Sequence, residues 1–330
     1  MNFRKFFIAS CILLSTNTLF ADVAVPYGEG SGKVDYINNK RFQKLEDPLP
    51  WGPLSFRMVE NNVWIADSVG GKLMQFNKEG KLISEFSVLP EGTKPYTIDE
   101  YKNPCLNILI DDIAPVLGDY GSVTAWWVAD SLENRLLKFS LDGKKLAEIK
   151  NPDFVQLYGV EVGIGGHIFV ADKGANSIFT YDSQGQLINK QNWEWSGMAV
   201  AGSDEKLYRL MYIGEEQRNM LVSTNLEGKV VKTVLLDVAN MLNPNLWWVD
   251  EVKKECVLTS TPEGGFKGSF KIYRIGLEDG KVIAQGEIKA PYFMNRFIDN
   301  IDYEDVFIGK ANYSEAPEGK LEIVPFNMPK

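Results

Sequence analysis

Several carboxylates of this 330-residue chain lie where they could hold a cation. Each stands in or beside a short apolar segment with the alternation typical of a β-strand. Carboxylate and amide oxygens are the ligands that Ca²⁺ prefers, so two or three of them converging with an asparagine could bind Ca²⁺ or a similar divalent cation. The alternative is that these side chains contact only water. The candidates for the metal site are Glu161, Asp250 and Asp299, and the wider set adds Asp111, Asp112, Glu251 and Asp302.

Aromatic and amide side chains at the same strand entries could hold an organic ligand. Aromatic rings around a channel mouth offer stacking surfaces to a sugar or a peptide side chain. The alternative is that rings placed before a glycine fill gaps between repeated units. Tyr96 and Phe293 are further aromatic residues near these entries. The candidate ligand-binding residues are Trp51, Tyr158, Trp195, Asn245, Asn295 and Arg296.

The single histidine, His167, limits the chemistry of the chain. With no second histidine, a His-rich zinc site is excluded. A Ser-His-Asp triad would need this residue, which we expect in a turn between two strands on the face opposite the ligand mouth. A structural or solvated role is therefore expected for it.

Three near copies of one segment indicate which elements position these residues. They begin at Val63, Trp126 and Ile168, and each has an apolar strand ending in Ala-Asp, a polar loop, a strand ending in an aromatic residue, a turn with glycine, and a third strand. A unit that recurs in this way must stack on its copies to bury its apolar face. The shared aspartates occur once per unit, so we expect them to accept hydrogen bonds from loop N–H groups rather than to converge. They are Asp67, Asp130 and Asp172.

Three weaker copies begin at Lys206, Cys256 and Asp305, and a further strand precedes each unit. Four short antiparallel strands repeated at about 40–60 residues are typical of propeller blades. The predicted fold is therefore all-β: a six-bladed β-propeller of four-stranded antiparallel blades. The sixth unit lacks its fourth strand, and we expect residues Lys33 to Ile37 to complete it, which would close the ring with an N-terminal strand.

The second unit departs from this pattern, because about forty residues separate Phe86 from Trp126. One interpretation places an inner strand near Leu106–Asp111 and an inserted loop from Ala114 to Val123. The other makes Tyr96 to Tyr101 the inner strand. If the insertion is a contact surface, the protein could be an assembly scaffold.

The N-terminus is typical of a secretory signal. Arg4 and Lys5 precede an apolar run that is too short for a membrane span, and Ala21 is a plausible cleavage point. We therefore expect a signal peptide at 1–21, an N-terminal segment with the ring-closing strand at 22–50, and the propeller at 51–330. The expected location is periplasmic or secreted, without membrane insertion.

The net charge limits the classes of partner that the protein is expected to bind. The net charge is −9, and removal of a leader that carries Arg4, Lys5 and no acidic residue would change it to −11. Such a surface repels nucleic acid and anionic lipid, so neither is an expected partner, and a monomer is expected.

Cys105 and Cys256 fall on opposite sides of the predicted ring, so we expect two buried free thiols rather than a disulfide.

The repeat resembles the NHL-repeat class of six-bladed propellers, and distantly the gluconolactonase and senescence-marker superfamily. The match is best from Trp127 to Lys144, with Tyr158 to Asp172 similar to the usual inner-strand lead-in. Such propellers include metal-dependent lactonases, amidating lyases and non-enzymatic binding modules. The lactonase-like group opens with Glu-Gly-Pro, whereas this chain has Trp51 before the Gly-Pro pair, which disfavours that activity. The lyase types rely on histidines.

The function expected from the sequence is that of an exported propeller which binds a small ligand, a glycan or a protein partner at its channel mouth, without catalysis. The alternative is a divalent-cation-dependent lactonase or hydrolase that uses the carboxylates at the mouth.

Overall fold

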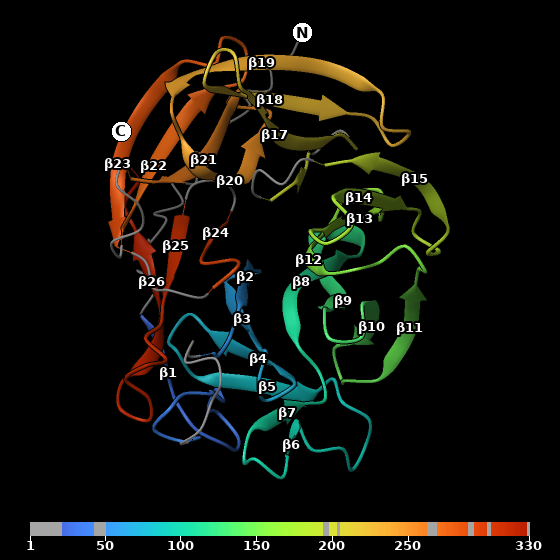
Figure 1. The fold of residues 1–330 in the computed structure, drawn as a ribbon, viewed down its shortest axis with the longest axis vertical. Coiled ribbons are helices and arrows are strands. Elements are labelled where there is room, and N and C mark those ends of the chain that lie inside the picture. Colours follow the sequence, from blue (N-terminus) through green and yellow to red (C-terminus); the bar gives the residue numbers. More distant parts are fainter. Residues whose placement is uncertain are drawn as a thin grey trace, which may run out of the picture.

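Six four-stranded antiparallel sheets surround a central axis in the computed structural model (Figure 1), which confirms the six-bladed propeller. Among the described residues the helical content is a single 3₁₀ turn, η1 (Asp119–Gly121). No helix among the described residues has the length and apolar character needed to cross a membrane. The structure describes residues 22–42, 51–193, 198–202, 205–262, 269–289, 294–301 and 305–328.

The first three blades follow one another along the chain, each starting with the strand nearest the axis. Blade 1 consists of β2 (Ser55–Val59), β3 (Asn62–Asp67), β4 (Lys72–Asn77) and β5 (Leu82–Ser87). Blade 2 consists of β8 (Ile110–Leu117), β9 (Val123–Asp130), β10 (Arg135–Ser140) and β11 (Lys145–Lys150). Blade 3 consists of β12 (Leu157–Val162), β13 (Ile168–Asp172), β14 (Ser177–Tyr181) and β15 (Leu187–Asn192).

The last three blades include the one that joins the two ends of the chain. Blade 4 consists of β16 (Val200–Ala201), β17 (Leu207–Ile213), β18 (Arg218–Thr224) and β19 (Val230–Ala239). Blade 5 consists of β20 (Leu242–Asp250), β21 (Glu255–Thr261), β22 (Ser269–Gly276) and β23 (Val282–Lys289). Blade 6 consists of β24 (Ile298–Ile301), β25 (Asp305–Lys310), β26 (Lys320–Phe326) and β1 (Val23–Pro26).

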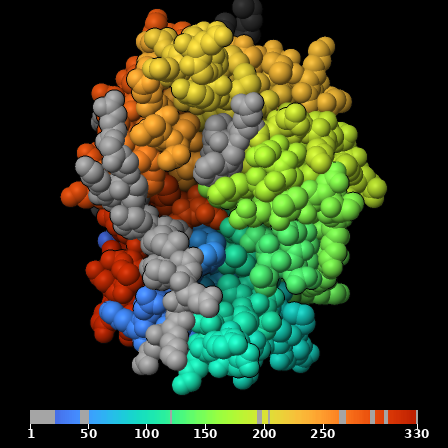
Figure 2. All heavy atoms as spheres, viewed as in Figure 1, coloured from blue at the N-terminus to red at the C-terminus, as the bar shows by residue number. Residues whose placement is uncertain are grey.

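The ring closes with an N-terminal strand, as predicted, but the strand is β1 and not residues Lys33 to Ile37. Val23 and Val25 pair with Ile323 and Leu321 of β26 and are fully buried. The N-terminal residues lie against the C-terminal blade in the space-filling view (Figure 2). The segment from Lys33 to Ile37 instead passes over blade 1, with isolated bridges between Tyr27 and Val34 and between Ile37 and Trp51.

Both interpretations of the second unit were wrong about its inner strand. That strand is β8, and residues 114–117 of the expected loop belong to it. The insertion is a two-stranded hairpin ahead of the blade, formed by β6 (Tyr96–Ile98) and β7 (Pro104–Leu106). The hairpin projects from the ring beside the N-terminal loop (Figure 1).

Glycines and aspartates that recur in the repeat explain the turns and loops of the blades. Gly143 and Gly185 have φ values of 82° in the turns between third and fourth strands, a conformation that a residue with a Cβ rarely adopts. The repeat aspartates are fully buried and accept loop N–H groups, as expected. Asp130 accepts from Leu109 and Leu132, and Asp172 accepts from residues 155, 156 and 175.

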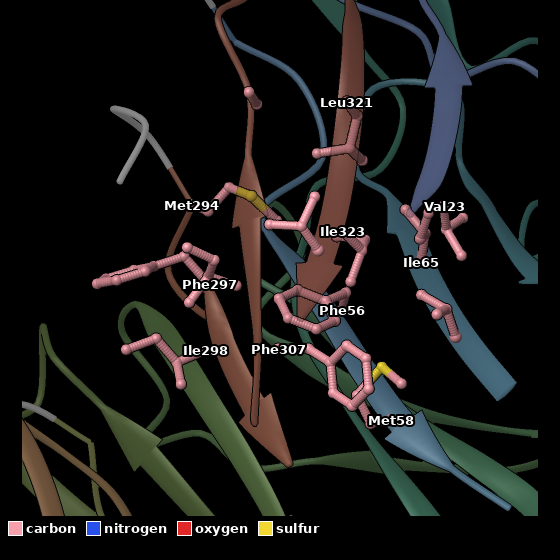
Figure 3. Close-up of a cluster of buried hydrophobic side chains, with 14 of the residues drawn as sticks. Val23, Phe56, Met58, Ile65, Met294, Phe297, Ile298, Phe307, Leu321 and Ile323 are labelled. Atoms are coloured by element: carbon pink, nitrogen blue, oxygen red, sulfur yellow. The ribbon is translucent and has the colours of Figure 1, made fainter. Parts of the chain in front are cut away.

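Aromatic side chains fill the spaces between blades. Trp64 of blade 1 contacts Trp126 of blade 2, with ring centroids 4.8 Å apart. Trp126 packs toward blade 1, whereas Trp127 packs in the cluster shared with blade 3, so the Trp-Trp pair divides between the two faces of its strand. A further cluster joins blades 1 and 6 around Phe56 and Phe307 (Figure 3).

Both cysteines beyond the predicted leader are free thiols, but only one is buried. Burial raises the pKa of the Cys256 thiol to about 12, which makes it unreactive at neutral pH. Cys105 is exposed, because it lies in the inserted hairpin rather than in a blade.

Candidate functional site

A buried ion pair crosses the centre of the ring. Arg296 lies two residues before β24 of blade 6, and Asp112 lies near the start of β8 in blade 2. The guanidinium donates to both oxygens of Asp112, at 3.1 Å from Nε and 3.0 Å from the terminal nitrogen. The Arg296 side chain is 1 % exposed and that of Asp112 is fully buried. The pair therefore links two blades across the channel.

A second arginine extends the pair into a network. Arg57, in the middle of β2, donates to the backbone carbonyls of Ile113 and Val160, at 2.7 and 2.9 Å. Its guanidinium also lies 3.1 Å from Oε1 of Glu161, and the same oxygen accepts from Arg296 at 2.6 Å. We call Arg57, Asp112, Glu161 and Arg296 the central network. Its members come from four inner strands or their entries, β2, β8, β12 and β24, around the axis in Figure 1.

The charges within the central network stabilise one another. Burial alone would raise the pKa of Asp112, but Arg296 and Arg57 hold it below its usual value. Burial alone would lower the pKa of Arg296, but Asp112 and Glu161 raise it. Ser55 donates to Asp112 at 2.6 Å, and the N–H of Val160 donates to it at 3.2 Å, so the buried carboxylate is fully hydrogen-bonded.

Two further carboxylates lie beside the central network and are half-buried. Burial raises the pKa of Asp111 to about 7, although the Asn295 amide donates to it at 2.7 Å. Burial also raises the pKa of Asp299, which accepts the N–H of Met58 at 2.7 Å and lies near both arginines. The channel entrance, meaning the end at which the inner strands begin, thus carries groups that both donate and accept hydrogen bonds.

The pKa of Asp111 makes a prediction about stability. Its value of about 7 in the folded protein exceeds the unfolded value of about 4, so the folded state binds more protons between these pH values. The contribution of this group is present below about pH 4 and is lost as the pH rises through 7. We expect Asp111→Asn to remove that part of the decline in unfolding free energy, measured by urea denaturation from pH 4 to 8. Asp305→Asn, on an exposed position of β25, serves as the control. Parallel curves for Asp111→Asn and the wild type would contradict the prediction.

The structure brings together seven of the residues singled out in the sequence. Asp112, Glu161 and Arg296 belong to the central network, and Asp111, Asn295 and Asp299 lie beside it. Tyr158 is half-buried near Asp111 and Asp112; burial is the main cause of its raised pKa, and their charges raise it further.

The other candidates lie elsewhere. Asp250 ends β20 and accepts the N–H groups of Val252 and Lys253 in its own turn, and Asn245 is half-buried on the same strand. Trp51 packs with Ile37, Phe42 and Val69 beneath the N-terminal segment. Trp195, Phe293 and Asp302 lie outside the described residues.

Among the described residues, neither metal-binding side chains nor the single histidine gives a second candidate site. Within the described ranges, no three His, Cys, Asp or Glu side chains are grouped so as to hold a metal ion. His167 lies in the turn between β12 and β13, as predicted, with Nδ1 3.8 Å from a Glu205 oxygen. The sequence reasoning missed Arg57 and Ser55. Their signal is a charged and a polar residue in the otherwise apolar segment Leu54–Val59, on a strand that is almost wholly buried.

Comparisons with known proteins support the propeller fold. No family model and no curated protein sequence matches the chain. Solved structures do match, among them hydrazine synthase of Kuenenia stuttgartiensis, with 12 % identity over 84 % of this chain and 88 % of that chain and a TM-score of 0.51. A protein of unknown function from Bacteroides caccae matches with 12 % identity over 81 % and 96 % and a TM-score of 0.52. A streptogramin B lyase matches with 16 % identity over 83 % and 94 % and a TM-score of 0.48. At these identities the first two matches concern the fold alone, and nothing is argued from the lyase match.

Proposed function

We propose that the protein is a binding propeller whose channel entrance takes a small polar ligand, with a glycan as the best-matched class, and that it performs no catalysis there. The observation that carries the proposal is the central network. Its arginines are held in buried ion pairs, while half-buried carboxylate and amide groups of Asp111, Asn295 and Asp299 lie beside it. Fixed donors and acceptors of this kind suit the hydroxyl groups of a sugar.

The electrostatics of the entrance favour binding over catalysis. Ser55 is a hydroxyl that donates to the central network, and its partner Asp112 has a lowered pKa and is held by Arg296. A carboxylate in that state is a poor general base, so it would not activate the serine. Arg296 would also have to be displaced before a cation could use the Asp112 oxygens.

The alternative function is a divalent-cation-dependent lactonase or hydrolase. The observation in its favour is the pair of carboxylates with raised pKa values, Asp111 and Asp299, because perturbed carboxylates gather at catalytic sites. A cation would have to draw its ligands from these two residues and from Glu161, whose Oε1 is already shared by two arginines. We therefore rank this function second.

We also propose export and an NHL-like repeat. The recurring Ala-Asp strand ends at Asp67, Asp130 and Asp172 support the repeat class. Export is supported by residues 1–21, which resemble a signal peptide. Cleavage after Ala21 would leave Asp22 as the first residue, directly before the start of β1 at Val23. We propose a periplasmic or secreted monomer that binds neither nucleic acid nor membrane, in keeping with its negative charge.

One preparation tests location and binding together. The full chain is expressed with its own N-terminus, and the intact mass of the exported protein should correspond to a chain that starts at Asp22. That protein is applied to a glycan array, and hits are measured by calorimetry. We expect Asn295→Ala to weaken binding about tenfold, because one hydrogen-bonding amide is lost, whereas Asn39→Ala at an exposed loop position should not.

The outcomes separate the two functions. Glycan binding that persists in EDTA supports the non-catalytic proposal. The hydrolase alternative would gain support if Ca²⁺ raised the melting temperature and EDTA reversed the effect. An array without any hit would count against a glycan ligand.

A further inference from the structure

Two parts of the chain that do not belong to the blade repeat meet beside blade 1 (Figure 1). One is the segment from Tyr27 to Phe42, which we call the strap, and the other is the hairpin β6–β7. The hairpin forms a two-stranded sheet of its own, and an isolated sheet of two strands is at best marginally stable in water. The hairpin therefore needs support from contacts with the rest of the protein.

Arg41 joins the strap to the hairpin. Its guanidinium pairs with Asp35 and Glu29 of the strap and donates to the phenol oxygen of Tyr96 in the hairpin. The same phenol donates to Glu29 at 2.9 Å. The guanidinium carbon also lies 5.2 Å from the ring centroid of Phe42 and 5.5 Å from that of Tyr96. The two carboxylates thus take their cation from the strap itself, and the same arginine holds the hairpin.

The strap and the hairpin also share a small hydrophobic core. Ile37 and Phe42 of the strap are buried with Val69 of blade 1. Tyr96 and Leu106 of the hairpin pack against this group, and the rings of Phe42 and Tyr96 meet edge-on at 5.8 Å. This cluster is separate from the clusters that fill and join the blades. A segment with its own small core can open without unfolding the rest of a protein.

Polar contacts attach the strap to the propeller. The N–H of Asp35 donates to both oxygens of Asp67, each at 3.1 Å, and the Asn38 amide donates to the carbonyls of Tyr313 and Ala316. In blades 2 and 3 the aspartate that corresponds to Asp67 accepts N–H groups from the entry of its own blade. In blade 1 the strap supplies this donor. The strap therefore occupies the place that an entry loop occupies in the other two blades.

A cavity of about 650 Å³ lies between these two segments and blade 1. Gly28 and Gly30 line one side, residues 94–98 line another, and the turn of Asp67 and Gly70 forms the floor. The φ values of the first two glycines are 137° and 100°, which residues with a Cβ rarely adopt. Part of the strap is therefore separated from blade 1 by open space, and glycines at its start can act as a hinge.

We infer that the strap and the hairpin form a lid that opens as one unit and uncovers the Asp67 turn of blade 1, with Arg41 as its latch. Opening separates Asp35 from Asp67 but leaves the blade intact, because β2 to β5 form their own sheet. The closed lid is favoured, because opening removes a hydrogen-bond donor from a fully buried carboxylate. The inference is independent of the proposed channel function.

Hydrogen exchange of the full chain, followed by mass spectrometry, tests the lid. Arg41→Met removes the guanidinium but retains an unbranched side chain. We expect exchange to become about tenfold faster both in the strap and in residues 94–107, because the charge-assisted hydrogen bonds of the latch are lost. Exchange in β3 and β4 should not change. Lys33→Met removes a positive charge from an exposed strap position and should leave both segments unchanged.

Tyr96→Phe tests the coupling from the side of the hairpin. It removes the phenol that contacts Glu29 and Arg41, so exchange in the strap should become about fivefold faster. Tyr101→Phe makes the same change at a hairpin position that is 67 % exposed and should have no effect. The inference is overturned if Arg41→Met does not speed exchange in the hairpin, if Tyr96→Phe does not speed it in the strap, or if β3 and β4 exchange faster together with the lid.

Discussion

Arg296→Met is expected to lower the free energy of unfolding by about 3–5 kcal/mol, the range found when one partner of a buried ion pair is removed. The substitution retains an unbranched side chain but leaves Asp112 without its bidentate donor, and that carboxylate is fully buried. Glu161 would keep Arg57 as a partner, so the loss falls mainly on Asp112. Urea denaturation followed by tryptophan fluorescence measures the change.

A surface ion pair provides the matched control for Arg296→Met. Lys281 lies 3.1 Å from Asp279, with both side chains more than half exposed, so Lys281→Met should cost under about 1 kcal/mol. The additional change Asp112→Asn should recover part of the stability lost in Arg296→Met, because it removes the buried charge. If Arg296→Met cost no more than the control, the central network would not be the element that holds the four inner strands together.

The sequence predicts the fold better than the site, because the blades depend on local patterns whereas the site depends on contacts between residues far apart in the chain. Strand alternation, the Ala-Asp strand ends and the glycine turns are local, so the copies from Val63, Trp126 and Ile168 are enough to predict blades. Arg296 and Asp112 are 184 residues apart, and their pairing depends on how inner strands of different blades meet. The sequence therefore singled out Arg296, Asp112 and Glu161 as candidates but did not predict the contacts among them.

The ring-closing strand was misplaced for a related reason. Residues Lys33 to Ile37 alternate like a strand, whereas β1 has only four residues and ends at Pro26. A proline cannot donate to a ladder, but β1 is the outermost strand of its blade and pairs on one side only, where a proline is tolerated. The alternating segment is used instead to bring the N–H of Asp35 to Asp67, a contact that no local pattern indicates.

Val25→Asn is expected to lower the free energy of unfolding by about 3–5 kcal/mol, because β1 closes the ring. Val25 is fully buried and pairs with Leu321. The change loses about 1.5–3 kcal/mol of apolar burial and places an amide in a site without a polar partner, which costs about 1–3 kcal/mol more. The measurement is again equilibrium unfolding in urea.

The same substitution one residue earlier separates ring closure from a general effect of asparagine in a strand. Ala24 is half-buried on the other face of β1 and pairs with Glu322, so Ala24→Asn keeps the backbone ladder and should cost under about 1 kcal/mol. If Val25→Asn proved as mild as Ala24→Asn, blade 6 would be stable without its outermost strand. A large difference between them would mean that apolar contacts of β1, and not its hydrogen bonds alone, join the two ends of the propeller.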